Sequence, residues 1–294
     1  MRTYWLDFFI GSVQYLNRMK RIFICMMAAL FMFGCCPSKQ GETKPQRKVG
    51  VAMFTFYKRN LDEVIPLLKD MGVDAIGLSS TALSAKFPKV KTGPEMNAEQ
   101  KAYLKKLLAD NGMKIASFGV RTPTEEAKIK EMCEFAKEFD IPLILTESVG
   151  GTIGLWDKYC QQYGLKMALH NHASDIVKRN SYFNPNITRA AIADYKNVYA
   201  CPDNGHYARS GIQGVAAYKI LEGKIAMLHF KDMSKFDDLK ARTVPFGKGV
   251  LDLPALLAEL DRQKFDGYFM IEYEANFDNN IAEVKECVDY LRSH

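Results

Sequence analysis

The chain has 294 residues, of which 48% are hydrophobic and 25% are charged, and this is enough for one large domain with its own core. The first 48 residues hold eight of the 40 basic and two of the 34 acidic residues, which accounts for the whole net charge of +6, so the rest of the chain has 32 of each and is neutral. A neutral domain lacks the basic surface that nucleic-acid binding requires, and we therefore expect no nucleic-acid partner.

The N-terminal segment has the pattern of an export signal. Met19-Lys20-Arg21 is basic, and residues 22–33 form an apolar run of the length typical of signal peptides. The run ends at Phe33-Gly34-Cys35, which resembles a bacterial lipoprotein cleavage site at which Cys35 would be lipidated. We therefore expect a leader over 1–36, a tether over 37–48 and a folded domain over 49–294, held at the cell envelope or in the periplasm by a lipid anchor. A membrane-spanning helix is the alternative, but the run is shorter than the ~20 residues that a span needs.

Short apolar runs alternate with amphipathic segments from residue 49 onward. The expected strands cover 49–54, 74–78, 114–120, 141–146, 165–169, 198–201, 225–230 and 268–273. The expected helices cover 61–71, 98–110, 123–139, 155–163, 187–195, 213–221, 253–263 and 281–291. Strands that alternate with helices predict a parallel sheet, and eight such units predict an α/β fold of the (β/α)8 TIM-barrel type. A dinucleotide-binding sheet is disfavoured, because no GxGxxG motif follows the first strand.

Cysteine spacing gives no sign of a disulfide framework. Outside the leader the chain has four scattered cysteines and no CxxC pair: Cys133, Cys160, Cys201 and Cys287. We expect them to be buried thiols.

Carboxylates and histidines follow the predicted strands, where TIM barrels build their active sites. The set comprises Glu147, His170, His172, Asp203, His206, His229, Lys231, Asp232, Glu272 and Glu274. Four of the five histidines of the chain belong to this set. Taken singly, Asp203 is explained as a turn residue or helix cap, Lys231 and Asp232 as an exposed ion pair, and Glu274 as a solvated residue.

Taken together, Asp203, His229 and Glu272 on three successive strand ends predict a metal site. Carboxylate and imidazole ligands without thiolate suit Mn²⁺, Mg²⁺, Co²⁺ or Zn²⁺, and ligand type alone does not choose among these divalent metals.

Several longer motifs then resemble one protein family. They are Leu169-His170-Asn171-His172, the segment from Cys201-Pro202-Asp203 to Ser210-Gly211, His229-Phe230-Lys231-Asp232, the segment 244–252, and the segment from Gly267 to Glu274. In combination they resemble the sugar phosphate isomerase/epimerase superfamily of xylose isomerase-like barrels over about residues 49–291. The resemblance implies that Asp203, His229 and Glu272 are metal ligands and that His206 contacts the substrate.

The chain departs from this superfamily at one position. Ketose 3-epimerases of the superfamily have a catalytic, metal-binding glutamate on the fifth strand, and His170 stands there in this chain. Glu147, one strand earlier, is the candidate for the missing carboxylate. The predicted ligand set is therefore Glu147, His170, Asp203, His229 and Glu272. The predicted base is Glu272 or Glu147, the predicted acid or orienting group is His172 or His206, and Arg209 and Lys231 join these histidines as predicted substrate contacts.

The resemblance implies a metal-dependent isomerase or epimerase that acts on a small carbohydrate by removing a proton next to a carbonyl, through an enediolate. The alternative is a lyase or dehydratase acting on a 3-keto-glycoside or inosose, which His170 favours. A non-catalytic sugar-binding lipoprotein is the non-enzyme alternative, and the neutral domain disfavours a DNA-repair endonuclease of this fold. Loops 79–94 and 233–249 are long enough to cover the site, and an oligomer remains open.

Overall fold

Eight parallel strands form the wall of a barrel in this computed structural model, which describes residues 46–176 and 181–294. The strands are β1 (Lys48–Ala52), β2 (Ala75–Leu78), β3 (Lys114–Phe118), β4 (Leu143–Thr146), β5 (Lys166–His170), β6 (Val198–Cys201), β7 (Leu228–Phe230) and β10 (Tyr268–Ile271). They are hydrogen-bonded in the order β6-β5-β4-β3-β2-β1-β10-β7. Isolated parallel bridges join Ala200 to Ile225 and Asp203 to His229, so β6 and β7 meet and nearly close the barrel. The predicted TIM barrel is confirmed.

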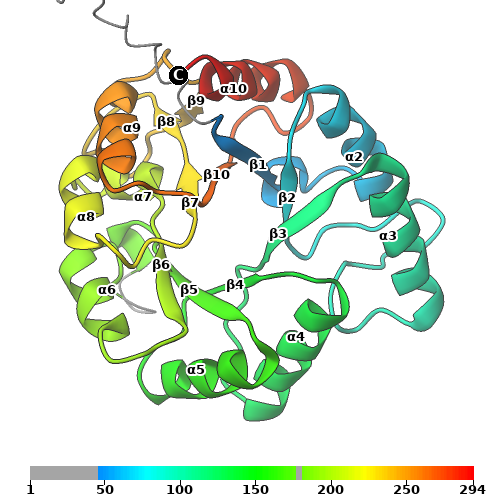
Figure 1. Cartoon of the computed structure of the whole chain (residues 1–294). Helices are drawn as coiled ribbons and strands as arrows, with labels where there is room; N and C mark the ends of the chain where they lie inside the picture. Colours follow the sequence, from blue (N-terminus) through cyan, green and yellow to red (C-terminus); the bar gives the residue numbers. More distant parts are fainter. Residues whose placement is uncertain (1–45, 177–180) are drawn as a thin grey trace, which may run out of the picture. The chain divides into compact units, whose positions relative to one another are not determined.

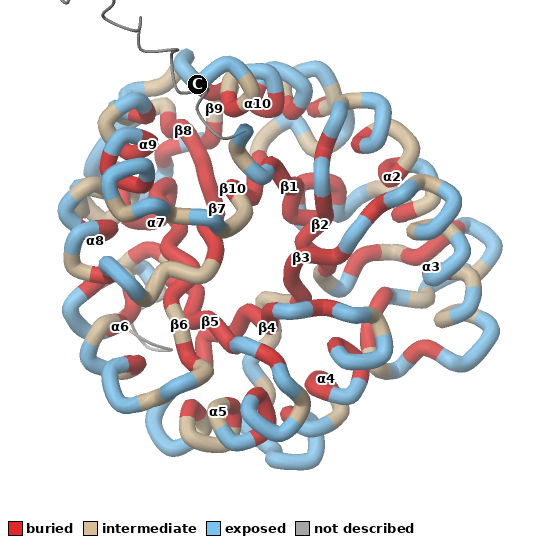
Figure 2. Tube along the Cα trace, in the orientation of Figure 1, coloured by how far each residue is buried: buried red, intermediate tan, exposed pale blue. Residues whose placement is uncertain are grey.

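Helices surround the strands on the outside of the barrel (Figure 1). They are α2 (Leu61–Asp70), α3 (Ala98–Asn111), α4 (Glu126–Glu138), α5 (Gly151–Tyr163), α6 (Pro185–Ile192), α8 (Gly214–Ile220), α9 (Leu253–Arg262) and α10 (Ile281–Ser293). Strands such as Ala75–Leu78 and Leu143–Thr146 are buried at every position, as expected for parallel strands covered on both faces. Figure 2 shows this arrangement as a buried wall of strands, with helices that are buried inward and exposed outward.

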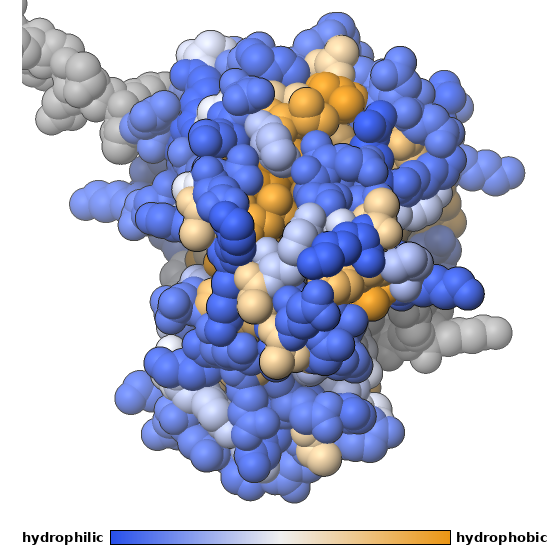
Figure 3. All heavy atoms as spheres, turned by 90° about the vertical axis from the view of Figure 1, so that its right-hand side faces the viewer, coloured by the Kyte–Doolittle hydropathy of each residue, from blue (hydrophilic) through white to orange (hydrophobic). Residues whose placement is uncertain are grey.

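The side of the barrel that carries α2 and α3 is predominantly polar (Figure 3). Figure 3, which faces the side of the barrel that carries α2 and α3, shows a mostly hydrophilic surface with separate apolar areas between the polar side chains. Within the described part of the chain, no helix is long and apolar enough to cross a bilayer. The predicted leader and its Cys35 lie outside the described residues, so the export signal and the lipid anchor stay predictions. Cys133, Cys160, Cys201 and Cys287 are free and buried, as predicted.

Some predicted boundaries were wrong at the ends of strands. The first strand ends at Ala52 because the chain then turns into the 3-10 helix η1 (Met53–Phe56). Residues 204–206, which follow the expected strand 198–201 and were assigned to no helix, begin the helix α7 (Asn204–Arg209). This helix forms because Asp203 Oδ1 accepts a hydrogen bond of 2.9 Å from the backbone N–H of His206, which caps the helix N-terminus.

Further short elements were not predicted. They are η2 (Ser174–Ile176) and an antiparallel pair, β8 (Asp232–Met233) and β9 (Thr243–Val244). Elements this short have no periodic apolar pattern that the sequence could show.

Asp232 organises the loop that follows β9. Its carboxylate accepts backbone N–H groups from Met233, Gly247, Gly249 and Leu251 at 2.8–3.3 Å, and it is fully buried. A Cβ on Gly249 would lie 2.1 Å from Asp232 Oδ1, so only glycine lets the backbone come this close. The expectation of an exposed pair between Lys231 and Asp232 was therefore wrong, because Asp232 turns to the backbone of its own loop.

We expect Asp232→Ala to lower the free energy of unfolding by about 3 kcal/mol, because several buried N–H groups would lose a charged acceptor. Chemical denaturation followed by circular dichroism measures this. Asp238→Ala is the control, because Asp238 accepts one backbone N–H, from Lys240, in an exposed loop. Equal stability of the two variants would contradict the role of Asp232.

Candidate active site

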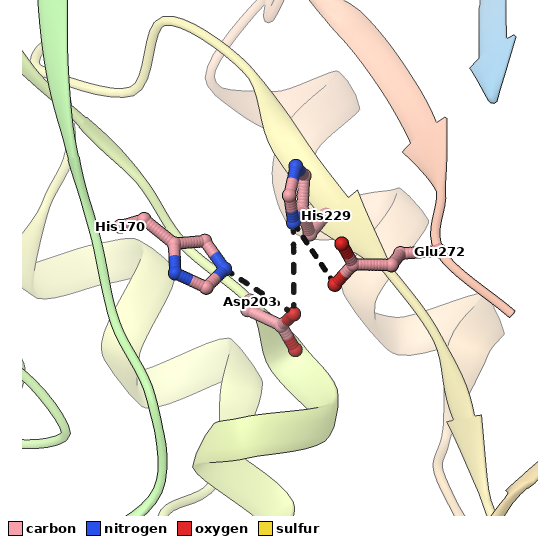
Figure 4. Close-up of side chains that lie close together, drawn as sticks. All are labelled: His170, Asp203, His229 and Glu272. Atoms are coloured by element: carbon pink, nitrogen blue, oxygen red, sulfur yellow. Dashed lines mark hydrogen bonds and ion pairs between the residues drawn. The ribbon is translucent and has the colours of Figure 1, made fainter. Parts of the chain in front are cut away.

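Four buried side chains from four neighbouring strand ends form the centre of the candidate site. His170 ends β5, Asp203 follows β6, His229 lies in β7, and Glu272 follows β10. One ligand atom from each lies within 4.8 Å of the others. Figure 4 shows the four side chains pointing toward one another. The bridge between Asp203 and His229 explains part of this arrangement, because it places the two residues side by side where the barrel closes.

The ligand atoms of this donor cluster, defined as His170, Asp203, His229 and Glu272, lie close to one another. His170 Nε2 lies 3.6 Å from Asp203 Oδ2, and His229 Nδ1 lies 3.8 Å from the same oxygen and 3.1 Å from Glu272 Oε2. Within the described residues His170 Nε2 is buried without a hydrogen bond, and the buried Asp203 Oδ2 also has none but lies 2.9 Å from the ammonium of Lys231. Unpartnered buried polar atoms are rare in folded proteins. Two imidazole nitrogens and two carboxylates that converge in this way fit a divalent cation of the Mn²⁺, Mg²⁺, Co²⁺ or Zn²⁺ class.

Lys231 supplies a positive charge behind the donor cluster. Its Nζ lies 2.9 Å from Asp203 Oδ2, 2.7 Å from Glu272 Oε2 and 2.9 Å from Glu274 Oε1, and its side chain is fully buried. Burial alone would lower the pKa of Lys231, but the three carboxylates outweigh burial and raise it. The side chain reaches this position across Gly205, where a Cβ would lie 2.7 Å from Lys231 Cδ.

Glu274 is less exposed than the sequence suggested. Its carboxylate binds the ammonium of Lys231 and, 3.1 Å away, the guanidinium of Arg209. The expectation of a freely solvated Glu274 was therefore wrong. Arg209 also donates to the Ala241 carbonyl at 3.1 Å, so this side chain ties α7 to the residues after β10 and before β9.

Glu147 forms a second group with two histidines. Its Oε1 lies 3.1 Å from His170 Nδ1 and also contacts His172 Nδ1. A proton on His170 Nδ1 that is donated to Glu147 leaves Nε2 free to bind a metal, which is how outer carboxylates commonly orient metal-binding histidines. The position of Glu147 behind His170 therefore suits an orienting group better than the predicted base.

Electrostatics sets the protonation of this cluster. Burial alone would raise the pKa values of Asp203 and Glu272, but nearby groups hold both well below their usual range. For Asp203 the chief cause is the charge of Lys231, and for Glu272 the causes are His229 and Lys231. Burial would lower the pKa of His170, yet the neighbouring carboxylates of Asp203 and Glu147 raise it to about 10. A metal and a proton therefore compete for His170 Nε2.

His206 differs from the other histidines. Burial, with a smaller effect from Lys231, holds the pKa of its imidazole well below the usual value, so it is neutral near pH 7. Its Nε2 is buried without a hydrogen-bond partner and lies 3.9 Å from Asp203 Oδ2. A neutral imidazole at this position can donate or accept one hydrogen bond without adding charge to the site.

A cavity of about 420 Å³ opens onto the donor cluster, a volume within the range of small-molecule sites. Five of the polar residues expected at the strand ends line it: His170, His172, His229, Glu272 and Glu274. Loop 79–94 contributes Ser79, Ser80 and Lys91, as its length suggested, whereas loop 233–249 lines none of this cavity because Asp232 and the β8–β9 pair hold it aside. Glu147, Asp203, His206, Arg209 and Lys231 lie behind the lining.

Sequence reasoning missed two lining residues, Phe54 and Tyr57, which follow β1. Both are aromatic and close to half exposed. The aromatic run Phe54-Thr55-Phe56-Tyr57 was the available signal, but Phe54 was assigned to the end of the expected strand 49–54 and the rest of the run to the connection after it.

Comparisons with known proteins agree with this barrel. Inosose dehydratase of Clostridium perfringens is 25% identical over 129 residues, which are 39% of this chain and 42% of that protein, so the match spans less than half of the curated relative. A sugar phosphate isomerase/epimerase from Parabacteroides distasonis superposes with a TM-score of 0.63 at 13% identity, covering 86% of this chain and 96% of that one. The 3-keto-D-glucoside 4-epimerase of E. coli superposes with a TM-score of 0.65 at 14% identity, covering 84% of this chain and all (100%) of that one.

At these sequence identities the two superpositions establish a shared fold only. The family described as xylose isomerase-like TIM barrel matches residues 65–294, which is most of the chain. With eight parallel strands and the polar cluster at their carboxyl ends, the chain belongs to the xylose isomerase-like TIM barrel family.

Proposed function

We propose that this protein is a divalent-metal-dependent isomerase or epimerase of a small carbohydrate. The observation that carries the proposal is the convergence of His170, Asp203, His229 and Glu272 beside a cavity of about 420 Å³. In the part of the chain that the structure describes, His170 Nε2 is buried without a hydrogen bond, and the buried Asp203 Oδ2 also has none but is paired with the Lys231 ammonium 2.9 Å away. A buried imidazole nitrogen without a hydrogen bond is costly unless a ligand completes it, which supports a bound cation.

In this proposal His170, Asp203, His229 and Glu272 hold the metal, and Glu147 orients His170. A divalent ion bound there would polarise a sugar carbonyl as a Lewis acid. Glu272 lines the cavity, and its Oε2 is engaged by His229 and Lys231, whereas Oε1 has no hydrogen bond from the described residues. Glu272 is therefore the proposed base that removes a proton from the carbon next to the carbonyl to give an enediolate.

His172 is the proposed acid, which returns a proton to the enediolate. It lines the cavity with 32% of its side chain exposed, and Glu147 contacts its Nδ1, which leaves Nε2 for the substrate. Return of the proton to the opposite face of the enediolate gives epimerisation, and return to the neighbouring carbon gives isomerisation.

Dehydration is the second candidate. The curated match to inosose dehydratase supports it, together with His170 in place of the strand-five glutamate. The same proton removal by Glu272 would then be followed by loss of a β-hydroxyl group, to which His172 would give its proton. A sugar-binding lipoprotein without catalysis is the remaining non-enzyme candidate, and it would not need the base.

Metal content tests the proposal directly. We expect the purified protein, incubated with Mn²⁺, Co²⁺ or Zn²⁺ and desalted, to retain about one equivalent by mass spectrometry, and Asp203→Asn to lose it. The Asn side chain can still accept the His206 N–H and cap α7, but it puts an amide in place of a metal-binding oxygen.

Asp252→Asn is the matched control, because Asp252 caps α9 through a 3.0 Å bond from the Ala255 N–H and lies outside the donor cluster. Wild-type protein that stays metal-free after all three incubations, or Asp203→Asn that binds metal as the wild type does, would remove the basis of the proposal.

A further inference from the structure

We infer that the mouth of the cavity carries an aromatic subsite that binds a second sugar ring, so that the substrate is a glycoside of at least two rings rather than a free monosaccharide. The subsite consists of Phe54, Tyr57 and Phe277. The inference rests on the proposed function, because it takes the reacting ring to lie at the donor cluster.

The three rings form one cluster. Phe54 and Tyr57 are stacked with their centroids 5.5 Å apart and their planes 20° apart. Phe277 packs edge-on against both, with centroids 6.1 Å from Phe54 and 4.6 Å from Tyr57. Phe54 and Tyr57 nevertheless remain 45% and 43% exposed. Exposed aromatic clusters of this kind mark binding surfaces more often than isolated exposed residues do.

Buried hydrogen bonds hold the two loops that carry these rings. Thr55, between Phe54 and Tyr57, is fully buried, and its Oγ1 accepts the N–H of Tyr273 at 2.9 Å. The carbonyl of Thr55 accepts from Asn280 Nδ2 at 2.8 Å. The segment that carries Phe54 is thereby joined to the segment after β10 that carries Phe277.

An ion pair adds a second connection at the surface, where Lys58 Nζ lies 2.8 Å from the Asp278 carboxylate. Arg59 also donates to the Asp278 carbonyl at 3.1 Å. The rings are therefore held in place before any ligand arrives, which reduces the entropy lost on binding.

The surroundings of the rings select the class of ligand. Phe54 and Tyr57 line the same cavity as His170, His229 and Glu272, so one ligand can contact both groups. Ser79 and Lys91 also line this cavity, and Lys91 makes no ion pair within the described residues. A pyranose ring matches this combination, because its C–H face packs on an aromatic ring while its hydroxyl groups bond to serine and lysine.

Binding of matched one-ring and two-ring sugars tests the subsite. Metal-loaded protein is titrated by calorimetry with methyl α- and β-D-glucopyranoside and with a panel of α- and β-linked glucose disaccharides. We expect at least one disaccharide to bind about 5-fold or more tightly than either methyl glucoside, in line with the strength of ring contacts. In the double variant Phe54→Ala/Tyr57→Ala this gain should disappear while the affinity for the methyl glucosides is kept.

Phe236→Ala is the matched control, because Phe236 is an exposed aromatic residue (37%) that does not line this cavity. The inference is overturned if no disaccharide exceeds the methyl glucosides, or if the gain survives in the double variant. Metal content separates this result from a failure of the proposed function. If the protein binds metal but no disaccharide binds more tightly than the methyl glucosides, only the subsite is refuted. If the protein stays metal-free and a disaccharide gain still depends on Phe54 and Tyr57, the subsite is supported and the metal-dependent reaction is refuted.

Discussion

Glu272→Gln should lower turnover by about 10²- to 10⁴-fold, the range expected when a general base is removed. The amide keeps the size of the side chain and can still contact His229, but it cannot accept a proton from carbon. Because Lys231 and His229 hold the carboxylate of Glu272 ionised, the wild-type side chain is already in the form that accepts a proton.

The measurement is uptake of deuterium from D₂O at the carbon next to the carbonyl, followed by proton NMR on a panel of ketoses and 3-keto-glycosides. It detects proton removal whether the outcome is epimerisation, isomerisation or dehydration. Glu286→Gln, a surface glutamate of α10 that pairs with Lys248, serves as the control and should exchange at the wild-type rate. Exchange that persists in Glu272→Gln at the wild-type rate would rule out Glu272 as the base.

Lys231→Met should lower the free energy of unfolding of the metal-free protein by about 3–5 kcal/mol, the cost of leaving buried charges without their partner. Three carboxylates lie within 2.9 Å of the Lys231 ammonium, and two of them, Asp203 and Glu272, belong to the donor cluster. Methionine fills a similar volume, so the loss reports on charge more than on packing.

The same substitution should make the protein depend more strongly on metal. A divalent cation placed between Asp203 and Glu272 would replace part of the missing charge, and ligands that bind only the folded state raise its stability. Urea denaturation with and without Mn²⁺ measures both effects. Lys248→Met, which removes an exposed ion pair with Glu286, should change stability little. A Lys231→Met protein as stable as the wild type without metal would show that the ammonium does not balance these carboxylates.

The barrel could be predicted because the sequence patterns that specify its strands and helices are local. Each strand is a short apolar run, each helix has its own periodic pattern, and alternation of the two leaves few possible topologies. The donor cluster could be predicted for a related reason, since parallel strands in a barrel bring their carboxyl ends to one face. His170, Asp203, His229 and Glu272 were all found in this way, although their roles stay predictions.

The partners of the charged side chains could not be predicted, because they depend on contacts between distant strands. Lys231 was expected beside Asp232, its neighbour in sequence, but its ammonium binds Asp203, Glu272 and Glu274 from two other strand ends. Asp232, the next residue in sequence, instead accepts backbone N–H groups of the loop after β9. Glu147 likewise contacts His170 only because β4 and β5 are adjacent in the sheet.

The local pattern of apolar and polar residues was thus sufficient for the fold and for the polar side chains that gather at the strand ends. Folding alone decided which of those polar groups face the cavity, which stand behind it, and that Phe277 packs against Phe54 and Tyr57, which line the cavity. The physical reason is that apolar periodicity is a property of a single segment of sequence. Burial, charge pairing and cavity shape arise only when separate segments come together.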